Sequence, residues 1–419
     1  MPTERRPLNL TLLGWGLTVP VLLLSAIGLA CIHVTDRSGV AGADGAAAQT
    51  SGADEGWLPR VYHAVGPLTT RQIVYMLTGA GLMLLVLRPS YQKLGRYAYP
   101  FYCLAVLLLA LLVLDGVLDR FHLPGLPFVP VLRNTRRWID LGPLRFQPSE
   151  FMKLAFVLAL ARYLRFRSSY RRWRGLVPPF LLTIVPMFLI LFQPDLGTLL
   201  MLLPVLFSML FVAGARLRHL ALVVVLGGAL MPAFYLWGMK DYQRARIEVL
   251  FKQGTQDKSW QMDEGYQLRQ SKTALGTGGW TGQGYGEGIF VQYDGLLPEE
   301  HNDFIFAIIG HQWGLVGGLL VIVAYSVIVL LGLEVATVTN DPFGRLLAIG
   351  VVVMIVAQAL LNICMTIGLA PITGMPLPFV SAGGSSLWAN FLALGLLVNV
   401  AQRRPLLIAH APFEYGDEE

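Results

Sequence analysis

Long apolar runs without charge recur along most of the chain, and they restrict it to a membrane-spanning fold. A helix needs about 20 largely apolar residues to cross a bilayer. Runs of suitable length that contain no Asp, Glu, Lys or Arg lie at 7–35, 72–87, 97–114, 175–194, 196–215, 220–239 and 304–333. Only 14% of the 419 residues are charged, whereas soluble domains usually carry about 25%. The sequence therefore predicts an all-α polytopic membrane protein.

Two further stretches bring the expected number of transmembrane helices to about ten. The charge-free run 346–402 is too long for one helix, and four residues interrupt its middle: Pro371, Gly374, Pro376 and Pro378. Non-helical backbone at membrane depth must be buried in protein or line a cavity, so we expect two helices around a loop that helps to form an outward-facing cavity. The tenth helix, 150–165, begins with Glu150 and Lys153. The whole chain, 1–419, then forms a single integral membrane domain.

Basic residues predict the orientation of these helices. The loop 162–174 contains six arginines and no acidic residue: Arg162, Arg165, Arg167, Arg171, Arg172 and Arg174. Cytoplasmic loops of membrane proteins are enriched in Lys and Arg, so this loop and both termini are predicted to be cytoplasmic. This topology also accounts for the net charge of +6, and we expect no nucleic-acid partner.

Three segments are then expected outside the cytoplasm. Residues 36–71 are rich in Gly, Ala and Ser, which predicts a flexible excursion. Residues 240–303 form the largest loop, between helices 7 and 8. This loop and 115–149 are basic, against the positive-inside tendency. The cations either bind an anionic ligand such as a phosphate or pair with local acids. The candidates for ligand binding are Arg145, Arg244, Arg246 and Lys272, and the local acids include Asp140, Asp241 and Glu248.

The stretch 297–310, LPEEHNDFIFAIIG, places carboxylates where the largest loop enters the membrane. Asp303 directly precedes the apolar run, so we expect it to be the least hydrated of three acids, with Glu299 and Glu300 closer to water. Partial loss of water would make the Asp303 carboxylate a stronger base. Alternatively, Asn302 or Asp303 caps the N-terminus of the following helix.

Polar residues near other helix ends leave further alternatives open. Glu150 and Lys153 are three residues apart on one helix face, which indicates a substrate site or a structural ion pair. Ser149 and Asp195 are candidate helix caps. The segment 266–288 contains seven glycines, which either let the backbone approach a ligand or anion closely or form a merely irregular loop.

Five motifs carry a resemblance to a known family. They read RWIDLGPLRFQPSEFMK, FQPDLGT, YQLRQSKTALGTGGWTGQG, LPEEHNDFIFAIIG and PITGMPLPFVSAGGSS. In this order they resemble the SEDS family (shape, elongation, division and sporulation), which includes RodA and FtsW. They cover most of the chain from about residue 137 onward. The motif TGMPLPF is more similar to RodA than to FtsW.

The resemblance implies a ten-helix peptidoglycan glycosyltransferase of the bacterial inner membrane, acting in cell elongation and shape or in division. Its substrate would be lipid II, a disaccharide-pentapeptide on undecaprenyl pyrophosphate, among membrane lipids. Its partner would be a class B penicillin-binding protein, which is a transpeptidase. The essential aspartate of the family corresponds to Asp303, the expected catalytic residue.

The expected chemistry is an inverting transfer, in which cations hold the diphosphate and one carboxylate deprotonates the acceptor 4-hydroxyl. A divalent cation, Mg²⁺ or Mn²⁺, is the one cofactor that this chemistry suggests. The motifs and the outer-loop cations together give the candidate substrate-binding residues. These are Arg145, Glu150, Lys153, Arg244, Arg246, Gln267, Gln270, Ser271, Lys272, Glu299, Ser381 and Ser385.

The chain departs from the family pattern at three positions. His311 and Gln312 stand where the family commonly has two glutamates, and Ala382 stands where it commonly has tyrosine. These departures keep open a non-catalytic scaffold that activates a partner synthase. A lipid II flippase would use the same cavity and cations without covalent chemistry. Inverted repeats would favour a transporter, and the sequence shows none.

Overall fold

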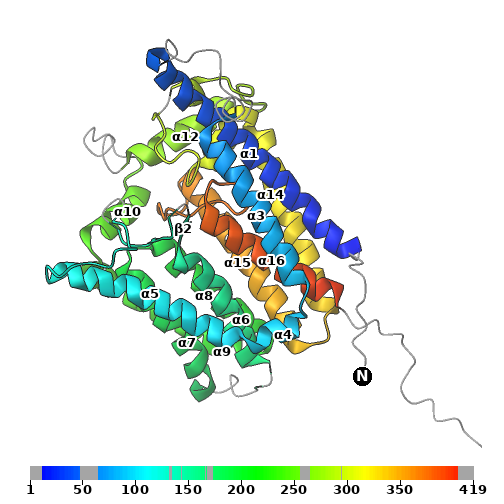
Figure 1. The fold of residues 1–419 in the computed structure, drawn as a ribbon. Helices are drawn as coiled ribbons and strands as arrows, with labels where there is room; N and C mark the ends of the chain where they lie inside the picture. The colour runs from blue at the N-terminus through cyan, green and yellow to red at the C-terminus, as the bar shows by residue number, and fades with distance from the viewer. Residues whose placement is uncertain are drawn as a thin grey trace, which may run out of the picture.

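The computed structural model describes residues 12–47, 65–131, 135–142, 144–165, 167, 173–254, 265–293 and 295–403. Long helices dominate it (Figure 1). They are α1 (Leu12–Ala47), α3 (Pro67–Leu87), α5 (Ala98–Arg120), α6 (Pro148–Leu164), α7 (Trp173–Phe192), α8 (Leu196–Ala213), α9 (Leu217–Ala233), α14 (Ile305–Val338), α15 (Pro342–Ile367) and α16 (Gly384–Gln402). Nine are long and apolar enough to cross a membrane, counted over the described ranges with α9 continued by the π-helix η2 (Phe234–Gly238). With α6, they confirm the expectation of about ten.

Short elements connect these helices. The short helices are α4 (Tyr91–Arg96), α10 (Asp241–Phe251), α12 (Tyr266–Gly278) and α13 (Ile289–Gln292). The strands β1 (Ile139–Asp140) and β2 (Arg145–Phe146) pair antiparallel, with Ile139 opposite Phe146 and Asp140 opposite Arg145. The last three helices, α10, α12 and α13, all belong to the large loop between the seventh and eighth long helices, where the sequence predicted a loop.

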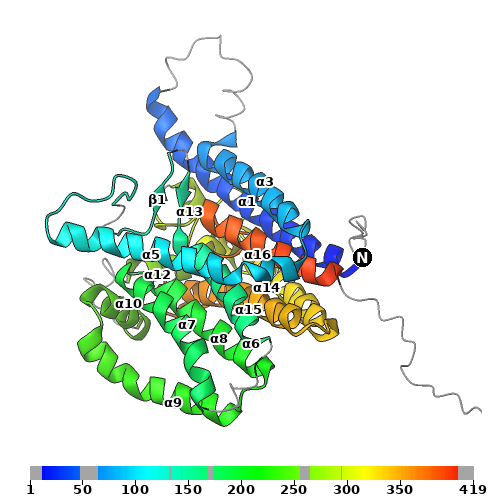
Figure 2. The ribbon, with the colours of Figure 1, turned by 60° about the horizontal axis from the view of Figure 1, so that its bottom comes forward.

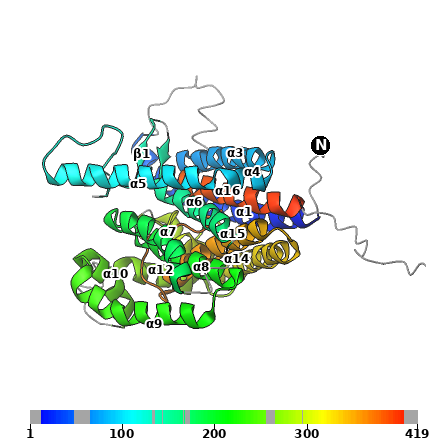
Figure 3. The ribbon, with the colours of Figure 1, turned by 90° about the horizontal axis from the view of Figure 1, so that it is seen from below.

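Helix α6 occupies the interior of the bundle. It contacts α5, α8, α15 and α16, and nearly all of its side chains are buried. A helix that is covered on all sides must be almost entirely apolar or must pair its charges internally. Helix α9 is the opposite case, because it lies at the edge of the molecule in Figures 2 and 3 and buries only His219 and Leu220.

The excursion after the first helix begins later than expected. Helix α1 continues beyond the predicted end at residue 35 to Ala47. The Asp36 carboxylate, which is buried, accepts hydrogen bonds from the N–H and hydroxyl of Thr69 at 2.9 and 3.0 Å. This carboxylate therefore fixes the start of α3 against α1. The predicted flexibility of 48–64 concerns residues outside the described part of the chain.

A break in α14 explains the glycine-rich segment. The helix has 34 residues, about 51 Å at 1.5 Å per residue, but Gly314 has non-helical angles (φ 62°, ψ −155°) that divide it. The segment 279–284 binds this break through its backbone: the N–H of Leu315 donates to Gly279 and that of Gln283 donates to His311, both at 2.9 Å. For residues 279–284, the close approach that glycines permit is to α14, and binding of a ligand by this segment stays a prediction.

Candidate functional site

Asp303 lies in a tight turn just before α14. The N–H groups of Asp303 and Phe304 both donate to the Glu299 carbonyl, at 3.0 and 3.2 Å, and Glu299 has a positive φ of 58°. Helix α14 begins at Ile305, and Phe304 occupies its N-cap position without a side-chain capping bond. The alternative that Asn302 or Asp303 caps this helix is therefore wrong.

Three successive carbonyls hold this turn in place. The His301 carbonyl accepts from the N–H of Ala382 at 2.9 Å. The Asn302 carbonyl accepts from the Ser381 hydroxyl at 2.5 Å, and the Asp303 carbonyl accepts from Asn362 Nδ2 at 2.8 Å. Two of the three donors belong to the loop 371–383, which is irregular and largely buried in protein, as the prolines and glycines predicted. The position of Asp303 is thus set by main-chain contacts to a rigid surround.

The Asp303 carboxylate faces Gly374 in this loop. Asp303 is partly exposed. A Cβ built on Gly374, which has φ +70°, would lie 3.4 Å from Asp303 Oδ2, and no other non-neighbouring atom of the described residues lies within 4 Å of it. A side chain at position 374 would therefore crowd one oxygen of the carboxylate, and glycine leaves that side of it uncovered, as suits a base that must reach a substrate hydroxyl.

We expect Gly374→Ala to reduce activity more than stability. The methyl group would cover one oxygen of Asp303, and activity should fall about tenfold, equivalent to about 1.4 kcal/mol. The positive φ alone costs about 1–2 kcal/mol. Gly142→Ala is the control, because Gly142 has φ +86° and open space around it. Equal activity of the two purified variants would show that Gly374 does not keep Asp303 accessible.

The three acids of the turn differ in burial from the expectation. Glu300 is only 5% exposed, whereas Glu299 and Asp303 are partly exposed. The prediction that Asp303 is the least hydrated is wrong, because folding of the turn places Glu300 inward. Glu299 Oε2 accepts from Asn302 Nδ2 at 2.9 Å, so this side chain also stabilises the turn.

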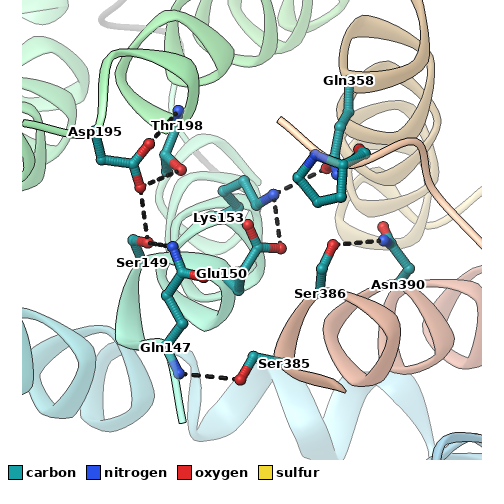
Figure 4. Close-up of polar contacts among 11 residues, drawn as sticks. Gln147, Ser149, Glu150, Lys153, Asp195, Thr198, Gln358, Ser385, Ser386 and Asn390 are labelled. Atoms are coloured by element: carbon teal, nitrogen blue, oxygen red, sulfur yellow. Dashed lines mark hydrogen bonds and ion pairs between the residues drawn. The ribbon is translucent and has the colours of Figure 1, made fainter. Parts of the chain in front are cut away.

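Glu150 and Lys153 form a buried ion pair at the centre of the bundle (Figure 4). Lys153 Nζ lies 3.0 Å from Glu150 Oε2, and both residues are at most 3% exposed. Lys153 Nζ also donates to Gln358 Oε1 of α15 at 2.9 Å, and Gln358 Nε2 donates to the Pro376 carbonyl at 2.8 Å. The structural alternative is confirmed, and the pair is linked through Gln358 to the loop that faces Asp303.

The N-terminus of α6 is bound to two neighbouring helices (Figure 4). The N-cap residue is Gln147, so the prediction that Ser149 caps the helix is wrong. Ser149 instead donates to Asp195 Oδ2 at 3.1 Å, while Asp195 caps α8 as predicted, through Thr198 N–H at 3.2 Å. The Gln147 N–H donates to the Ser385 hydroxyl at 3.0 Å.

Several outer-loop cations pair within the protein. Arg136 forms ion pairs with Asp115 and Asp119, and Arg137 donates to two carbonyls of the α7–α8 connection. Arg244 donates to the Leu236 carbonyl at 2.8 Å and lies 3.9 Å from Asp241. Pairing with local acids is thus confirmed for Arg136, while Arg137 and Arg244 bond mainly to main-chain carbonyls. Arg145 and Lys272 are exposed, and Lys272 donates only weakly, to Gln253 at 3.2 Å.

The structure separates the remaining candidate binding residues by burial. Ser271, Ser381 and Ser385 are buried and bond to protein carbonyls or N–H groups. Gln267 and Gln270 of α12 are partly exposed, and so is Arg246 of α10. These three residues are exposed enough to contact a ligand. The three buried serines instead position main-chain segments through their hydrogen bonds.

The two departures after FAIIG are structural in this chain. His311 Nδ1 and the Thr277 hydroxyl form a hydrogen bond of 2.8 Å, whose direction depends on the His311 tautomer. Gln312 Oε1 accepts from the Gly286 N–H at 2.8 Å. Both residues are at most 1% exposed. They fasten the glycine-rich segment to the break in α14 without a carboxylate.

Sequence reasoning missed two buried amides, Gln358 and Asn362. Both lie on α15, and each donates to the loop 371–383: Gln358 to Pro376 and Asn362 to Met375, the latter at 2.6 Å. The available signal was their spacing of four residues inside an otherwise apolar run, which places two polar side chains on one helix face.

Comparisons with known proteins identify relatives of this chain. The sequence model of the FtsW, RodA and SpoVE family, described as cell cycle proteins, matches residues 60–405. A probable peptidoglycan glycosyltransferase FtsW of Geobacter sulfurreducens is 32% identical over 386 residues, 91% of this chain and 95% of the relative. The peptidoglycan glycosyltransferase MrdB of Escherichia coli is 36% identical over 289 residues, 67% of this chain and 74% of the relative.

Solved structures show the same architecture. A chain described under the structural coordination of polymerization and crosslinking by a peptidoglycan synthase complex superposes with a TM-score of 0.72. It is 28% identical and covers 96% of this chain and 100% of its own. The rod shape determining protein RodA of Thermus thermophilus superposes with a TM-score of 0.62 at 27% identity, covering 93% and 97% of the two chains. The closer similarity to RodA expected from TGMPLPF stays a prediction, because both branches match at comparable identity.

Proposed function

Because this chain belongs to the FtsW, RodA and SpoVE family and is a peptidoglycan glycosyltransferase, we propose that it polymerises lipid II with Asp303 as the general base. The observation that carries this proposal is the Asp303 turn. Asp303 is partly exposed and its carboxylate lies beside Gly374, while the backbone of the turn is bound at three successive carbonyls. A base needs both features, access to the substrate and a fixed position.

In the proposed reaction, Asp303 accepts the proton of the acceptor 4-hydroxyl. The hydroxyl oxygen forms a bond to C1 of the donor sugar as the bond from C1 to the phosphate oxygen breaks. Undecaprenyl pyrophosphate leaves with that electron pair. Because pyrophosphate is a good leaving group, no strong acid has to protonate it, and one carboxylate suffices where hydrolysis of ordinary glycosides uses two. A single displacement on an α-linked donor gives a β-linked product.

The diphosphate is assigned to exposed cations of the outer loops. Arg145 and Lys272 are exposed, and the Arg145 carbonyl accepts from Ser385 at 3.0 Å, directly after the loop that faces Asp303. Arg246, Gln267 and Gln270 are further candidates. Charge-assisted contacts to phosphate are about twice as strong as neutral ones, so these residues would stabilise the leaving group.

A divalent cation, Mg²⁺ or Mn²⁺, would supply additional positive charge at the diphosphate. Mg²⁺ sites commonly use one or two carboxylates together with substrate phosphates. The described residues contain no cluster of three or more metal-binding side chains, so a protein-only cage is not available there. Glu299 and Asp303 are partly exposed, so their carboxylates could bind the cation together with the substrate phosphates.

We assign the protein to the bacterial inner membrane, with a class B penicillin-binding protein as its transpeptidase partner. The similarity to a chain from a synthase complex that coordinates polymerization and crosslinking supports this partner.

A reporter fused after Arg171 should report cytoplasm, and one inserted after Ala47 should report the outer side, because loop 162–174 is strongly basic. Reversal of both reporters would place Asp303 on the wrong side for this function.

Labelled lipid II tests the proposed function against its two alternatives. Purified protein, with and without its transpeptidase partner, should convert the label into glycan strands that are resolved on a gel. Movement of the label between leaflets of a vesicle without polymer would support a flippase. Neither polymer nor movement, together with stimulation of a separate synthase, would support a scaffold.

A further inference from the structure

Helix α15 carries a stripe of fully buried polar residues on the face toward the site. Gln358, Asn362 and Thr366 are four residues apart, so they share one face, and none is accessible to solvent. Gln358 binds the Pro376 carbonyl at 2.8 Å, as described above, and the Thr366 carbonyl accepts from Ser271 of α12 at 2.9 Å. The stripe therefore joins α12, α15 and the loop 371–383 at one place.

Asn362 has a special place in this stripe because it contacts both sides of the site. Its Nδ2 donates to the Asp303 carbonyl at 2.8 Å and to the Met375 carbonyl at 2.6 Å. Met375 follows Gly374, the residue that faces the Asp303 carboxylate. One amide nitrogen thus ties the turn that carries the acid to the segment that lies over it.

The chemistry of the contact explains why asparagine is present. An amide NH₂ offers two hydrogens on one nitrogen, enough for two carbonyls, whereas a hydroxyl offers one and a carboxylate offers none. A flipped amide would place Oδ1 against two carbonyl oxygens, so the two acceptors fix the orientation. Among the described residues, Asn362 Oδ1 is buried without a hydrogen-bond partner. An unpaired buried acceptor lowers stability. The two hydrogen bonds that Nδ2 donates are therefore the reason for an asparagine at this position.

We propose that Asn362 is a positioning residue for the glycosyl transfer. Its amide sets the separation between the Asp303 turn and Gly374–Pro376, and so holds the carboxylate in reach of the acceptor hydroxyl. A general base works only within hydrogen-bond distance of the proton that it takes, and a misplacement of about 1 Å can cost about 10²-fold in rate. The inference rests on the proposed role of Asp303 as that base.

The test replaces Asn362 by leucine, which has a similar size and no donor. In full-length protein bound to its transpeptidase partner, we expect Asn362→Leu to lower kcat for lipid II polymerisation about 10²-fold. The KM for lipid II should change less than about threefold, because the substrate contacts are unaffected and only the reacting geometry changes. If Asn362→Leu does not fold, Asn362→Ser is the smaller replacement; its hydroxyl is too short to reach both carbonyls, so it should also lose at least about tenfold in kcat.

Asn399 of α16 provides a matched control. It is also fully buried, and its Nδ2 also donates to two carbonyls, those of Val86 and Pro89, both at 2.7 Å. Its Oδ1 accepts one further hydrogen bond, from the Tyr91 N–H at 3.1 Å. It lies near the C-terminal end of α16, whereas the Asp303 turn contacts Ser381 and Ala382 before the N-terminal end. Asn399→Leu removes three hydrogen bonds, so it should lower the melting temperature at least as much as Asn362→Leu but leave kcat per folded molecule within about twofold of wild type.

The outcomes separate this inference from the proposed function. An unchanged kcat in Asn362→Leu, or an equal loss in both leucine variants, would overturn the positioning role. Asp303→Asn measured in parallel tests the base itself: if that protein still polymerises lipid II, the proposed function fails whatever Asn362 does. If Asp303→Asn is inactive and Asn362→Leu has the wild-type kcat, only the positioning role is lost.

Discussion

Asp303→Asn protein will insert into the membrane and bind its partner normally, yet form no detectable glycan. Asparagine has nearly the size of aspartate, and the three carbonyl contacts of the turn are made by the main chain. The fold should therefore be preserved while the proton acceptor is lost. Loss of a general base costs about 10²–10⁴ in rate, which removes polymer from a gel assay.

The neighbouring acids provide the controls for this experiment. Glu300→Gln should cost much less, because Glu300 is buried and is not placed to meet a substrate. Glu299→Gln tests the other partly exposed carboxylate. Substantial polymer from Asp303→Asn, combined with an inactive Glu299→Gln, would transfer the role of base to Glu299.

Lys153→Met and Glu150→Gln will each strongly reduce the amount of folded protein. The two side chains lie 3.0 Å apart and are almost completely buried, so removing either one leaves an uncompensated charge in the bundle. Breaking such a pair costs about 3–5 kcal/mol. The double variant should recover part of this stability, because it leaves no unpaired charge. Thermal unfolding of the purified variants measures both effects.

The exposed pair Lys252–Glu248 of α10 is the control for the buried one. Its Nζ and Oε2 are 2.6 Å apart, but both side chains are at least 40% exposed. Lys252→Met should therefore change stability by no more than about 1 kcal/mol. If the double variant Glu150→Gln, Lys153→Met unfolds like wild type but makes no glycan, the pair has a functional role beyond stability.

Hydropathy and charge were sufficient to predict the membrane helices and to place Glu150 and Lys153 on one helix face, with an ion pair as one of two alternatives. Crossing a bilayer requires a local property, a long apolar run, and an i,i+3 pair is also local, so both are visible in sequence. The cap on α8 could be predicted from Asp195 for the same reason. The helix ends were less certain, since α1 extends to Ala47 through residues of mixed polarity.

The geometry around Asp303 could not be predicted, because it depends on contacts between distant segments. The burial of Glu300 follows from the turn at Glu299, and the turn follows from donors on Asn362, Ser381 and Ala382. The Ala382 donor is a main-chain N–H and the Ser381 donor is a hydroxyl, and neither group has a distinctive sequence pattern. The glycine-rich segment was ambiguous for a related reason, since glycines permit close approach but do not identify what approaches.

The bond from Ala382 to His301 also explains how this position can diverge in evolution. Ala382 contributes its N–H, and every amino acid except proline has that group. Exchange of the side chain, such as alanine here for the tyrosine that we expect in the family, therefore leaves the bond intact. Selection can alter the chemistry presented at position 382 without displacing Asp303, and we expect proline to be the substitution that this position does not tolerate.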